Sequence, residues 1–364
     1  MADGVALPVR VFSAPLRYVQ GPGALDRIGE HLGTRHSRAL VLVDEFLVES
    51  VAPRLRRALA DAGVDVTLTA IGGEVTQSRI DELANQGRPL RATVVVAVGG
   101  GKTLDTGKGV ARALGTRMVT VPTIASNDGP TSRVIALYDE EHRLVGTPRM
   151  EENPEAVIVD TELVSSAPAH FLVSGIGDAV AKRFEAAACS RGTGLTSHGS
   201  RPLELPLIIA EGCYAVLVRD GPEALADAGR GDASPALERV VEAVVLMSGL
   251  AFENGGLSLA HSMTRGLMIL QGAQDRLHGY QVAYGLLVQL AHEGDDRNYQ
   301  EVRSYLRSVG LPLSLRDLGA TASTAVFDAL ARAATRAPHL ANCVPVPTVA
   351  SLTAALRTVE SFTG

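Results

Sequence analysis

The chain has 364 residues, of which 46% are hydrophobic and 20% are charged, a composition typical of a globular protein long enough for two domains. Its 34 Lys and Arg residues against 40 Asp and Glu residues give a formal net charge of -6, with the basic residues scattered along the chain. This balance argues against a polyanion-binding protein, so we expect no nucleic acid partner. No apolar run approaches the roughly 18 to 20 residues of a membrane span.

Residues 1–16 lack the basic and apolar segments of an export signal. We therefore expect a soluble, cytoplasmic protein with no membrane partner. The three cysteines, Cys189, Cys213 and Cys343, form no CxxC pair, which predicts reduced and buried thiols. The 37 glycines, with no Trp and only 4% aromatic residues, favour a scaffold that brings its backbone close to a ligand.

The first 160 residues alternate short β-branched runs with helical stretches. The pattern predicts strands at residues 39–43, 64–68 and 94–98 with helices between them at 55–62 and 80–85. Two of these strands are continuous apolar runs, as burial on both faces of a parallel sheet requires. We expect further strands at residues 118–121 and 157–159, and a hairpin around 134–145.

Beyond about residue 165 the pattern becomes helical. Apolar residues repeat at three- and four-residue steps in several segments, which predict packed helices. These segments are 237–251, 259–270, 282–290, 299–309 and 324–336, with loops at 192–206 and 229–235. The sequence thus predicts an α/β dinucleotide-binding domain over residues 1–165 and an all-helical C-terminal domain over 166–364, which would hold the metal and substrate.

A glycine-rich turn, GGGKTLDT, follows the strand at 94–98 and opens a helix. The glycines let backbone amides approach a pyrophosphate, the helix start adds partial positive charge, and Lys102 can reach a phosphate oxygen. The spacing matches neither GxGxxG nor the P-loop. Anion binding and a merely tight strand-to-helix turn both remain open.

Two other segments could contact a nucleotide. Asp44 ends the strand at 39–43, where an acid commonly binds the adenosine ribose and favours NAD over NADP, or alternatively caps the following helix. Residues 122–132 follow another strand and are dense in hydroxyl groups. They could bind a nicotinamide ribose and a hydroxylated substrate, or form only a polar turn.

A metal site is a further possibility. In the segment GIGDAVAK and the residues after it, an apolar helical stripe leaves Asp178, Lys182 and Glu185 on another face. His261 follows a Gly-Gly pair, and His278 begins another predicted helix. One carboxylate and two imidazoles suit a divalent ion with a position open for substrate. Histidines that are merely solvated or bonded to backbone are the alternative.

Taken together, these segments resemble the glycerol dehydrogenase branch of the iron-containing alcohol dehydrogenase superfamily. The resemblance implies a dehydroquinate synthase-like fold, a homo-oligomer, and NAD-dependent interconversion of a secondary alcohol of a polyol and its ketone. It covers most of the chain and rests on RYVQGPGAL at 17–25, VDEF at 43–46, GGGKTLDTGK at 99–108, VPTIASNDGPTS at 121–132, VDTELVSSAP at 159–168, GIGDA at 175–179, GLAFENGGLSLAH at 249–261 and HGYQVAYG at 278–285.

The resemblance also implies site residues. The family's metal ligands fall on Asp178, His261 and His278, and Asp128 matches the acid that contacts substrate hydroxyls, where it could relay a proton. The implied NAD contacts are Asp44, Gly100, Gly101, Lys102, Thr103, Asp105, Thr123, Ser126, Ser132, Val134 and Tyr138.

Two positions depart from the family pattern. Lys182 stands where the iron enzymes place a fourth ligand, a histidine, which favours zinc over iron. Tyr280 replaces the glutamate of the usual HGE. Both changes favour an anionic, phosphorylated or amino-polyol substrate, for which Lys182 could be the anchor. Pairing of Lys182 with Glu185 or another acid is the alternative.

Two other functions are weighed against the dehydrogenase. A carbocycle-forming lyase of the dehydroquinate synthase type generally needs Glu as first ligand and many phosphate-binding bases, so Asp178 and the sparse bases argue against it. A non-catalytic nucleotide-binding protein on the same fold would not need every metal and nucleotide position to be intact.

Overall fold

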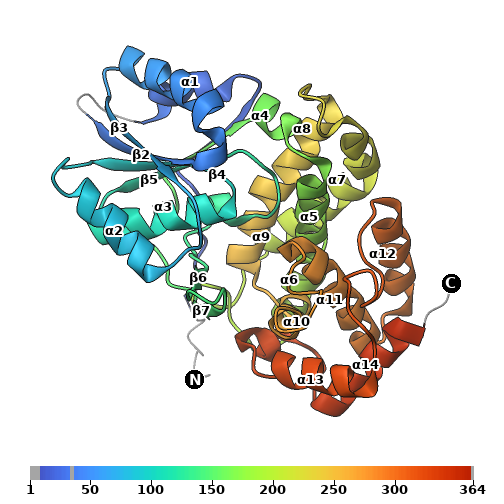
Figure 1. The fold of residues 1–364 in the computed structure, drawn as a ribbon. Coiled ribbons are helices and arrows are strands. Elements are labelled where there is room, and N and C mark those ends of the chain that lie inside the picture. The colour runs from blue at the N-terminus through green and yellow to red at the C-terminus, as the bar shows by residue number, and fades with distance from the viewer. Residues whose placement is uncertain (1–8, 33–36, 362–364) are drawn as a thin grey trace, which may run out of the picture. The chain divides into compact units, whose positions relative to one another are not determined.

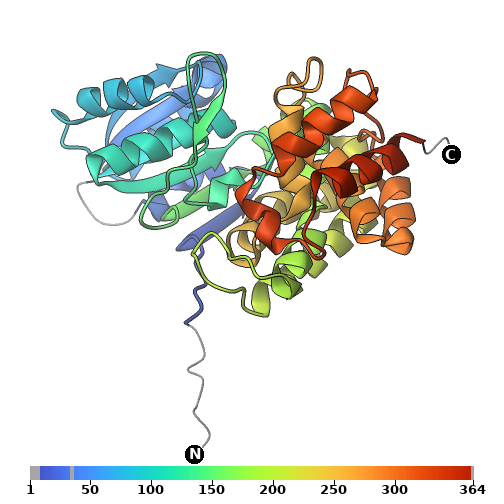
Figure 2. The same ribbon diagram turned by 90° about the horizontal axis from the view of Figure 1, so that it is seen from below.

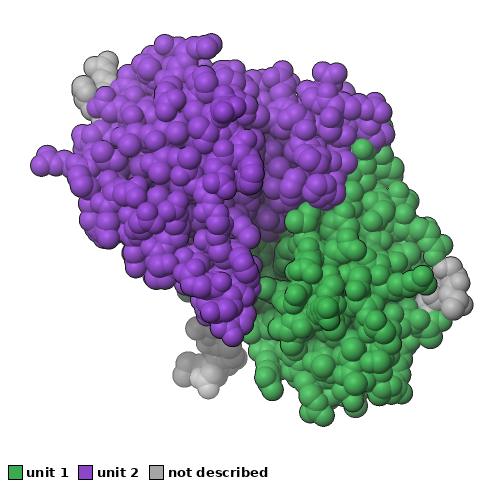
Figure 3. Space-filling model, in the orientation of Figure 1, with its two compact units in different colours: residues 1–13, 173–225, 250–364 green, residues 14–172, 226–249 purple. Residues whose placement is uncertain are grey.

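The computed structural model describes residues 9–32 and 37–361, and the chain divides into two compact units (Figure 3). The sheet unit comprises residues 14–172 and 226–249, and the helical unit comprises residues 1–13, 173–225 and 250–364. The expected division at residue 165 is a single boundary, whereas the sheet unit also takes in 226–249. One contact that joins residues 226–249 to the sheet unit is the hydrogen bond that the Gln20 side chain donates to the Glu238 carboxylate at 2.7 Å.

The sheet unit is built on six parallel strands in the order β1-β8-β5-β4-β2-β3. Figure 1 labels β2, β3, β4 and β5 of this sheet. Five of them confirm the predicted strands, and β1 at the edge was not predicted. The strands are β1 (Arg17–Gly21), β2 (Arg38–Asp44), β3 (Asp65–Ile71), β4 (Val94–Gly99), β5 (Arg117–Pro122) and β8 (Ala156–Asp160). The predicted hairpin is also present, as antiparallel β6 (Leu137–Tyr138) and β7 (Leu144–Gly146).

Helices cover both faces of this sheet because alternate strand residues face opposite sides. Val41 and Val43 of β2 pack with η1 (Ala24–His31) and α1 (Val48–Asp61). Leu40 and Leu42 pack with α2 (Gln77–Gly87) and α3 (Gly101–Leu114). Every residue of β4 is buried, as its apolar sequence predicts.

The rest of the chain is helical. The predicted helices from residue 237 onward are confirmed, and α7, which the sequence analysis took partly as loop, is an addition. The single helix expected from residue 175 is wrong, because the chain is helical from Ala169 to Ala179, turns at residues 180 and 181, and begins a second helix at Lys182. The elements are η2 (Glu45–Leu47), η3 (Gly129–Thr131), α4 (Thr161–Ser166), α5 (Ala169–Ala179), α6 (Lys182–Arg191), α7 (Leu205–Asp227), α8 (Pro235–Glu242), the π-helical turn η4 (Ala243–Met247), α9 (Ser248–Gly255), α10 (Leu259–Leu267), α11 (His278–Glu293), α12 (Asp296–Ser308), α13 (Thr324–Ala334), η5 (Pro338–Asn342) and α14 (Val349–Ser361). Figure 2 shows the same elements from below.

Within the part of the chain that the structure describes, no helix combines the length and apolar character needed to cross a bilayer. Residues 1–8, on which the expectation of no export signal partly rests, lie outside the described residues. All three cysteines are free thiols and buried, as predicted.

Candidate active site

Two glycines bring helices α5 and α11 into close contact. The backbone amide of Gly279 donates to the Ser174 hydroxyl at 3.2 Å. A Cβ on Gly279 would overlap the carbonyl oxygen of Ser174, and a Cβ on Gly177 would overlap that of Gly279. Only glycine therefore permits this approach at either position, which brings Asp178 close to His278.

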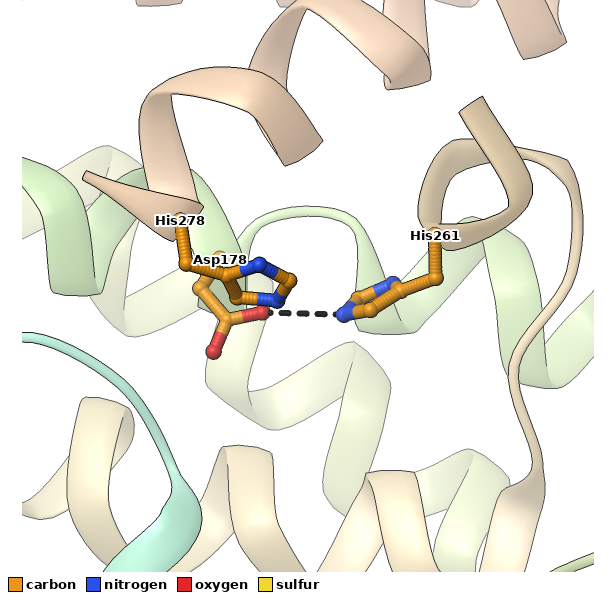
Figure 4. A group of neighbouring side chains, drawn as sticks. All are labelled: Asp178, His261 and His278. Atoms are coloured by element: carbon orange, nitrogen blue, oxygen red, sulfur yellow. Dashed lines mark hydrogen bonds and ion pairs between the residues drawn. The ribbon is translucent and has the colours of Figure 1, made fainter. Parts of the chain in front are cut away.

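Asp178, His261 and His278 converge, as the sequence predicts for a metal site (Figure 4). Their three candidate ligand atoms all lie within 4.8 Å of one another. Two bonds of about 2.1 Å at a tetrahedral angle place their ligand atoms roughly 3.4 Å apart, close to the 3.2 Å between Asp178 Oδ1 and His261 Nε2. Asp178 is buried, whereas His278 is exposed to solvent, so the cluster is accessible from outside. One carboxylate oxygen and two imidazole nitrogens form a donor set that fits a divalent ion and leaves room for a further ligand.

Glu185 orients His261, a role that the sequence analysis did not assign. Its carboxylate lies 2.6 Å from His261 Nδ1 and accepts the backbone amides of Ser258 and His261 at 2.8 and 3.0 Å. Helix α10 has no side-chain cap of its own, so Glu185 satisfies its first amides from another helix. The contact with Nδ1 leaves His261 Nε2 directed at Asp178, 3.2 Å from Oδ1.

The cluster is held by opposite charges. Burial disfavours the Asp178 carboxylate, but the Lys182 ammonium and His261 outweigh this effect and hold the pKa of Asp178 well below its ordinary value. Burial likewise disfavours a charged imidazole, but the Glu185 carboxylate outweighs it and raises the pKa of His261 to about 9. The ionised Asp178 is the form that binds a cation.

Lys182 belongs to this cluster. Its side chain is 1% exposed, and its ammonium donates to Asp178 Oδ1 at 2.5 Å and to the Asp178 carbonyl at 3.1 Å. It also lies 3.3 Å from His261 Nε2. The Lys182 ammonium thus pairs with the Asp178 carboxylate. Tyr280, two residues after His278 in the sequence, is half-buried, and burial raises the pKa of its phenol.

Some of the predicted nucleotide residues follow the carboxyl ends of neighbouring strands. Strand β3 lies on one side of β2, and β4 lies on the other. The direction in which successive strands are added to the sheet therefore reverses between β2 and β4. Ligands of open α/β sheets bind at such a reversal, beyond the carboxyl ends of the strands. Asp44 ends β2, Gly100 to Thr103 follow β4, and Thr123 follows β5, which neighbours β4.

Asp44 makes the contacts of a helix cap. Its carboxylate accepts the Phe46 amide at 3.1 Å and the Thr103 hydroxyl at 3.2 Å. The capping alternative is therefore present in the structure. The second bond also fixes Asp44 against the start of α3, beside the glycine turn.

Acidic partners hold both lysines of the GGGKTLDTGK segment. Lys102 Nζ lies 2.8 Å from Glu74, which also contacts His142. The fully buried Lys108 lies 2.9 Å from Asp105 and donates to the carbonyls of Gly129 and Val134. Asp105, which the resemblance assigns to NAD, also accepts the Ala136 amide at 2.9 Å. The sequence analysis assigned no role to Glu74 or Lys108, because a sequence does not reveal which residues a glutamate or a lysine contacts.

The loop at 122–132 is buried rather than a solvated turn. Thr123, Ser126 and Ser132 are all at most 9% exposed. The Ser132 hydroxyl accepts the Val134 amide at 2.9 Å, and the amide of Tyr138 donates to the Val75 carbonyl at 2.8 Å.

Asp128 lies in this loop and contacts the helix that contains η4. Ser248 donates its hydroxyl to the Asp128 carboxylate at 2.7 Å, and both residues are buried. The Thr131 hydroxyl reaches the Val245 carbonyl at 3.3 Å, within the π-helical turn. A π-helical turn inside an α-helix frequently marks a functional site. Ser248 is a further residue that the sequence analysis did not identify.

The chain is similar in sequence and in structure to known dehydrogenases. The model of the iron-containing alcohol dehydrogenase family matches residues 19–168. A glycerol dehydrogenase of Escherichia coli is 38% identical over 310 residues, covering 85% of this chain and 84% of its own length. A glycolaldehyde reductase of Halobacterium salinarum is 38% identical, with 89% of each chain covered. The crystal structure of a probable glycerol dehydrogenase from Sinorhizobium meliloti is 36% identical, has a TM-score of 0.90, and matches 97% of this chain and 99% of that one.

Proposed function

This chain belongs to the iron-containing alcohol dehydrogenase family, and we propose that it is an NAD- and zinc-dependent dehydrogenase of small polyols. The observation that carries the proposal is the convergence of Asp178, His261 and His278. Relatives named glycerol dehydrogenase, which align with most of the chain, support the same function. Neither the lyase nor the non-catalytic alternative gains support from any of these relatives.

The helical unit would hold the metal. When bound, a divalent ion supplies a Lewis acid that makes an alcohol hydroxyl more acidic, and NAD supplies the hydride acceptor. Asp178, His261 and His278 would be the protein ligands. Glu185 would keep His261 in the tautomer whose Nε2 has a lone pair toward the ion. We expect zinc rather than iron, because Lys182 stands where the iron enzymes supply a fourth ligand.

The sheet unit would hold NAD and the substrate hydroxyls. The glycine turn and the start of α3 would bind the pyrophosphate through backbone amides, with Asp44 at the ribose. The remaining assigned contacts, from Thr123 to Tyr138, would position the nicotinamide half. Asp128 would accept a hydrogen bond from a substrate hydroxyl and relay its proton. Ser248 fixes the carboxylate of Asp128 for this role.

Among substrates, a neutral vicinal diol has the stronger support. The Lys182 ammonium already pairs with Asp178 and is 1% exposed, which argues against its use as an anchor for phosphate or carboxylate. Relatives named glycerol dehydrogenase and glycolaldehyde reductase act on small neutral compounds by their names. A homo-oligomer, a cytoplasmic location and a domain boundary near residue 165 stay predictions.

A substrate panel tests the proposal. Zinc-loaded protein would be mixed with NAD and with glycerol, related diols, amino-polyols or polyol phosphates, and NADH would be followed by absorbance. We expect steady NADH formation with at least one neutral diol and much slower formation with the phosphates. No NADH with any member of the panel would contradict the proposal, and a preference for phosphates would restore Lys182 as an anchor.

A further inference from the structure

We propose that Lys182 is a built-in competitor of the metal: its ammonium binds the same carboxylate oxygen that the ion requires and lies beside the imidazole nitrogen that the ion also requires. The inference rests on the proposed metal site and concerns how tightly that site holds its ion. It assigns Lys182 a role in setting metal affinity rather than in contacting substrate.

The position of the ammonium carries the argument. Lys182 Nζ lies 2.5 Å from Asp178 Oδ1 and 3.3 Å from His261 Nε2. Those two atoms are themselves 3.2 Å apart and belong to the candidate metal ligands. A cation is therefore placed between two of the three ligands, at a distance from the oxygen typical of a strong charge-assisted hydrogen bond.

A backbone contact at the junction of two helices holds Lys182 in this place. Lys182 begins α6, and its ammonium also donates to the backbone carbonyl of Asp178, near the end of α5, at 3.1 Å. The side chain is 1% exposed, so it cannot exchange this position for bulk water without moving its whole stem. Besides the Lys182 ammonium, the cluster contains two carboxylates, Asp178 and Glu185, and two imidazoles, His261 and His278.

Competition follows from these contacts. A metal ion and an ammonium cannot share one oxygen lone pair, and two cations at this separation repel each other strongly in a buried site. Metal entry then requires Lys182 to release Asp178 Oδ1. Without the ion, the same ammonium compensates the buried carboxylate, which would otherwise destabilise the fold.

The test measures zinc affinity directly. Full-length protein stripped with a chelator would be titrated with zinc against a fluorescent chelator at constant pH. The variants would be Lys182→Met, which removes the charge, and Lys182→Gln, which keeps a donor for Asp178. Arg183→Met is the matched control, because Arg183 lies next in the chain but pairs with Glu211 at 2.7 Å.

We expect Lys182→Met to bind zinc at least about ten-fold more tightly than the wild type, with Lys182→Gln changed in the same direction and Arg183→Met unchanged. Stripped Lys182→Met should also melt at a lower temperature than the stripped wild type, and zinc should restore more of its stability. Unchanged or weaker zinc affinity in both Lys182 variants would overturn the inference. A weaker affinity would instead identify Lys182 as a ligand.

A further variant separates this inference from the proposed function. His278→Ala removes one candidate ligand and should weaken zinc binding severely. If His278→Ala binds zinc as the wild type does, the metal site itself is wrong, and the competition falls with it. If His278→Ala loses zinc while the Lys182 variants match the wild type, only the competition is wrong.

Discussion

At the scale of single residues, the site depends on carboxylates that each serve more than one partner. Glu185 accepts two backbone amides of helix α10 and also contacts His261 Nδ1. Asp178 contacts Lys182 and His261 at the same oxygen. The sequence pattern predicts Asp178, Lys182 and Glu185 on one face of a single helix, whereas Asp178 lies in α5 and the other two lie in α6. The pattern also cannot show that histidines from other helices reach them.

Glu185→Gln should weaken zinc binding by roughly 10- to 100-fold, the usual effect of losing a carboxylate behind a ligating histidine. The amide NH2 of glutamine would face His261 Nδ1 and favour the tautomer with the proton on Nε2, which cannot bind a metal. Zinc titration against a chelator measures the change. Glu211→Gln, on the exposed acid that pairs with Arg183, is the control and should be neutral. Wild-type affinity in Glu185→Gln would show that Glu185 serves only as a helix cap.

The cysteines should be inert in the native protein. Burial raises the pKa of Cys189 to about 11 and that of Cys343 to about 12. At pH 8 a thiol with a pKa near 11 is ionised in only about one molecule in a thousand, and the thiolate is the reactive form. A thiol-reactive chromophore should therefore label native protein very slowly up to pH 9 and all three cysteines after unfolding. Rapid labelling of the native protein would contradict the burial of these residues.

At the scale of elements, close helix contacts set the geometry of the metal ligands. The sequence predicted the helices that hold His261 and His278, but it did not predict the start of α5 or the approach of α5 to α11. That approach depends on Gly177 and Gly279, and a glycine in a sequence does not reveal which backbone it faces. Helix α7 escaped prediction because its buried face includes small or polar residues such as Ala210, Cys213 and Asp220.

Gly279→Ala should separate helices α5 and α11. The added Cβ would overlap the Ser174 carbonyl and lie 2.9 Å from the Asp178 amide, so the backbone must shift beside two candidate ligands. We expect a loss of about 1–3 kcal/mol in the free energy of unfolding, or more, together with weaker zinc binding. Chemical denaturation and zinc titration measure the two effects. Gly146→Ala, whose Cβ meets no atom closer than 3.9 Å, is the control. A stable Gly279→Ala that retains zinc would contradict this role.

The π-helical turn should act through Asp128. Ser248→Ala removes the hydroxyl that holds the Asp128 carboxylate, so the KM for the polyol should rise several-fold while the KM for NAD changes little. Steady-state kinetics with each substrate varied in turn separates the two constants. Ser165→Ala is the control, because Ser165 is also a buried serine of the sheet unit but donates only to a helical carbonyl. An equal rise in both constants would indicate a general structural effect.

At the scale of the whole molecule, the residues assigned to NAD and those assigned to the metal belong to different compact units. The strand pattern predicted the parallel sheet because its strands are continuous apolar runs, and the family resemblance indicated the ligands. The inclusion of residues 226–249 in the sheet unit was not predictable. It depends on contacts such as Gln20 with Glu238, which are more than two hundred residues apart in the chain.

The most direct test of the account is the dependence of turnover on metal content. Protein stripped with a chelator would receive increasing zinc, and NADH formation from a neutral diol would be recorded at each step. We predict no turnover before zinc is added and a plateau at about one ion per chain, since the three ligands form one site. The same zinc titration of His278→Ala should give almost no turnover. Full turnover in the stripped protein, or an unchanged titration of His278→Ala, would contradict the account.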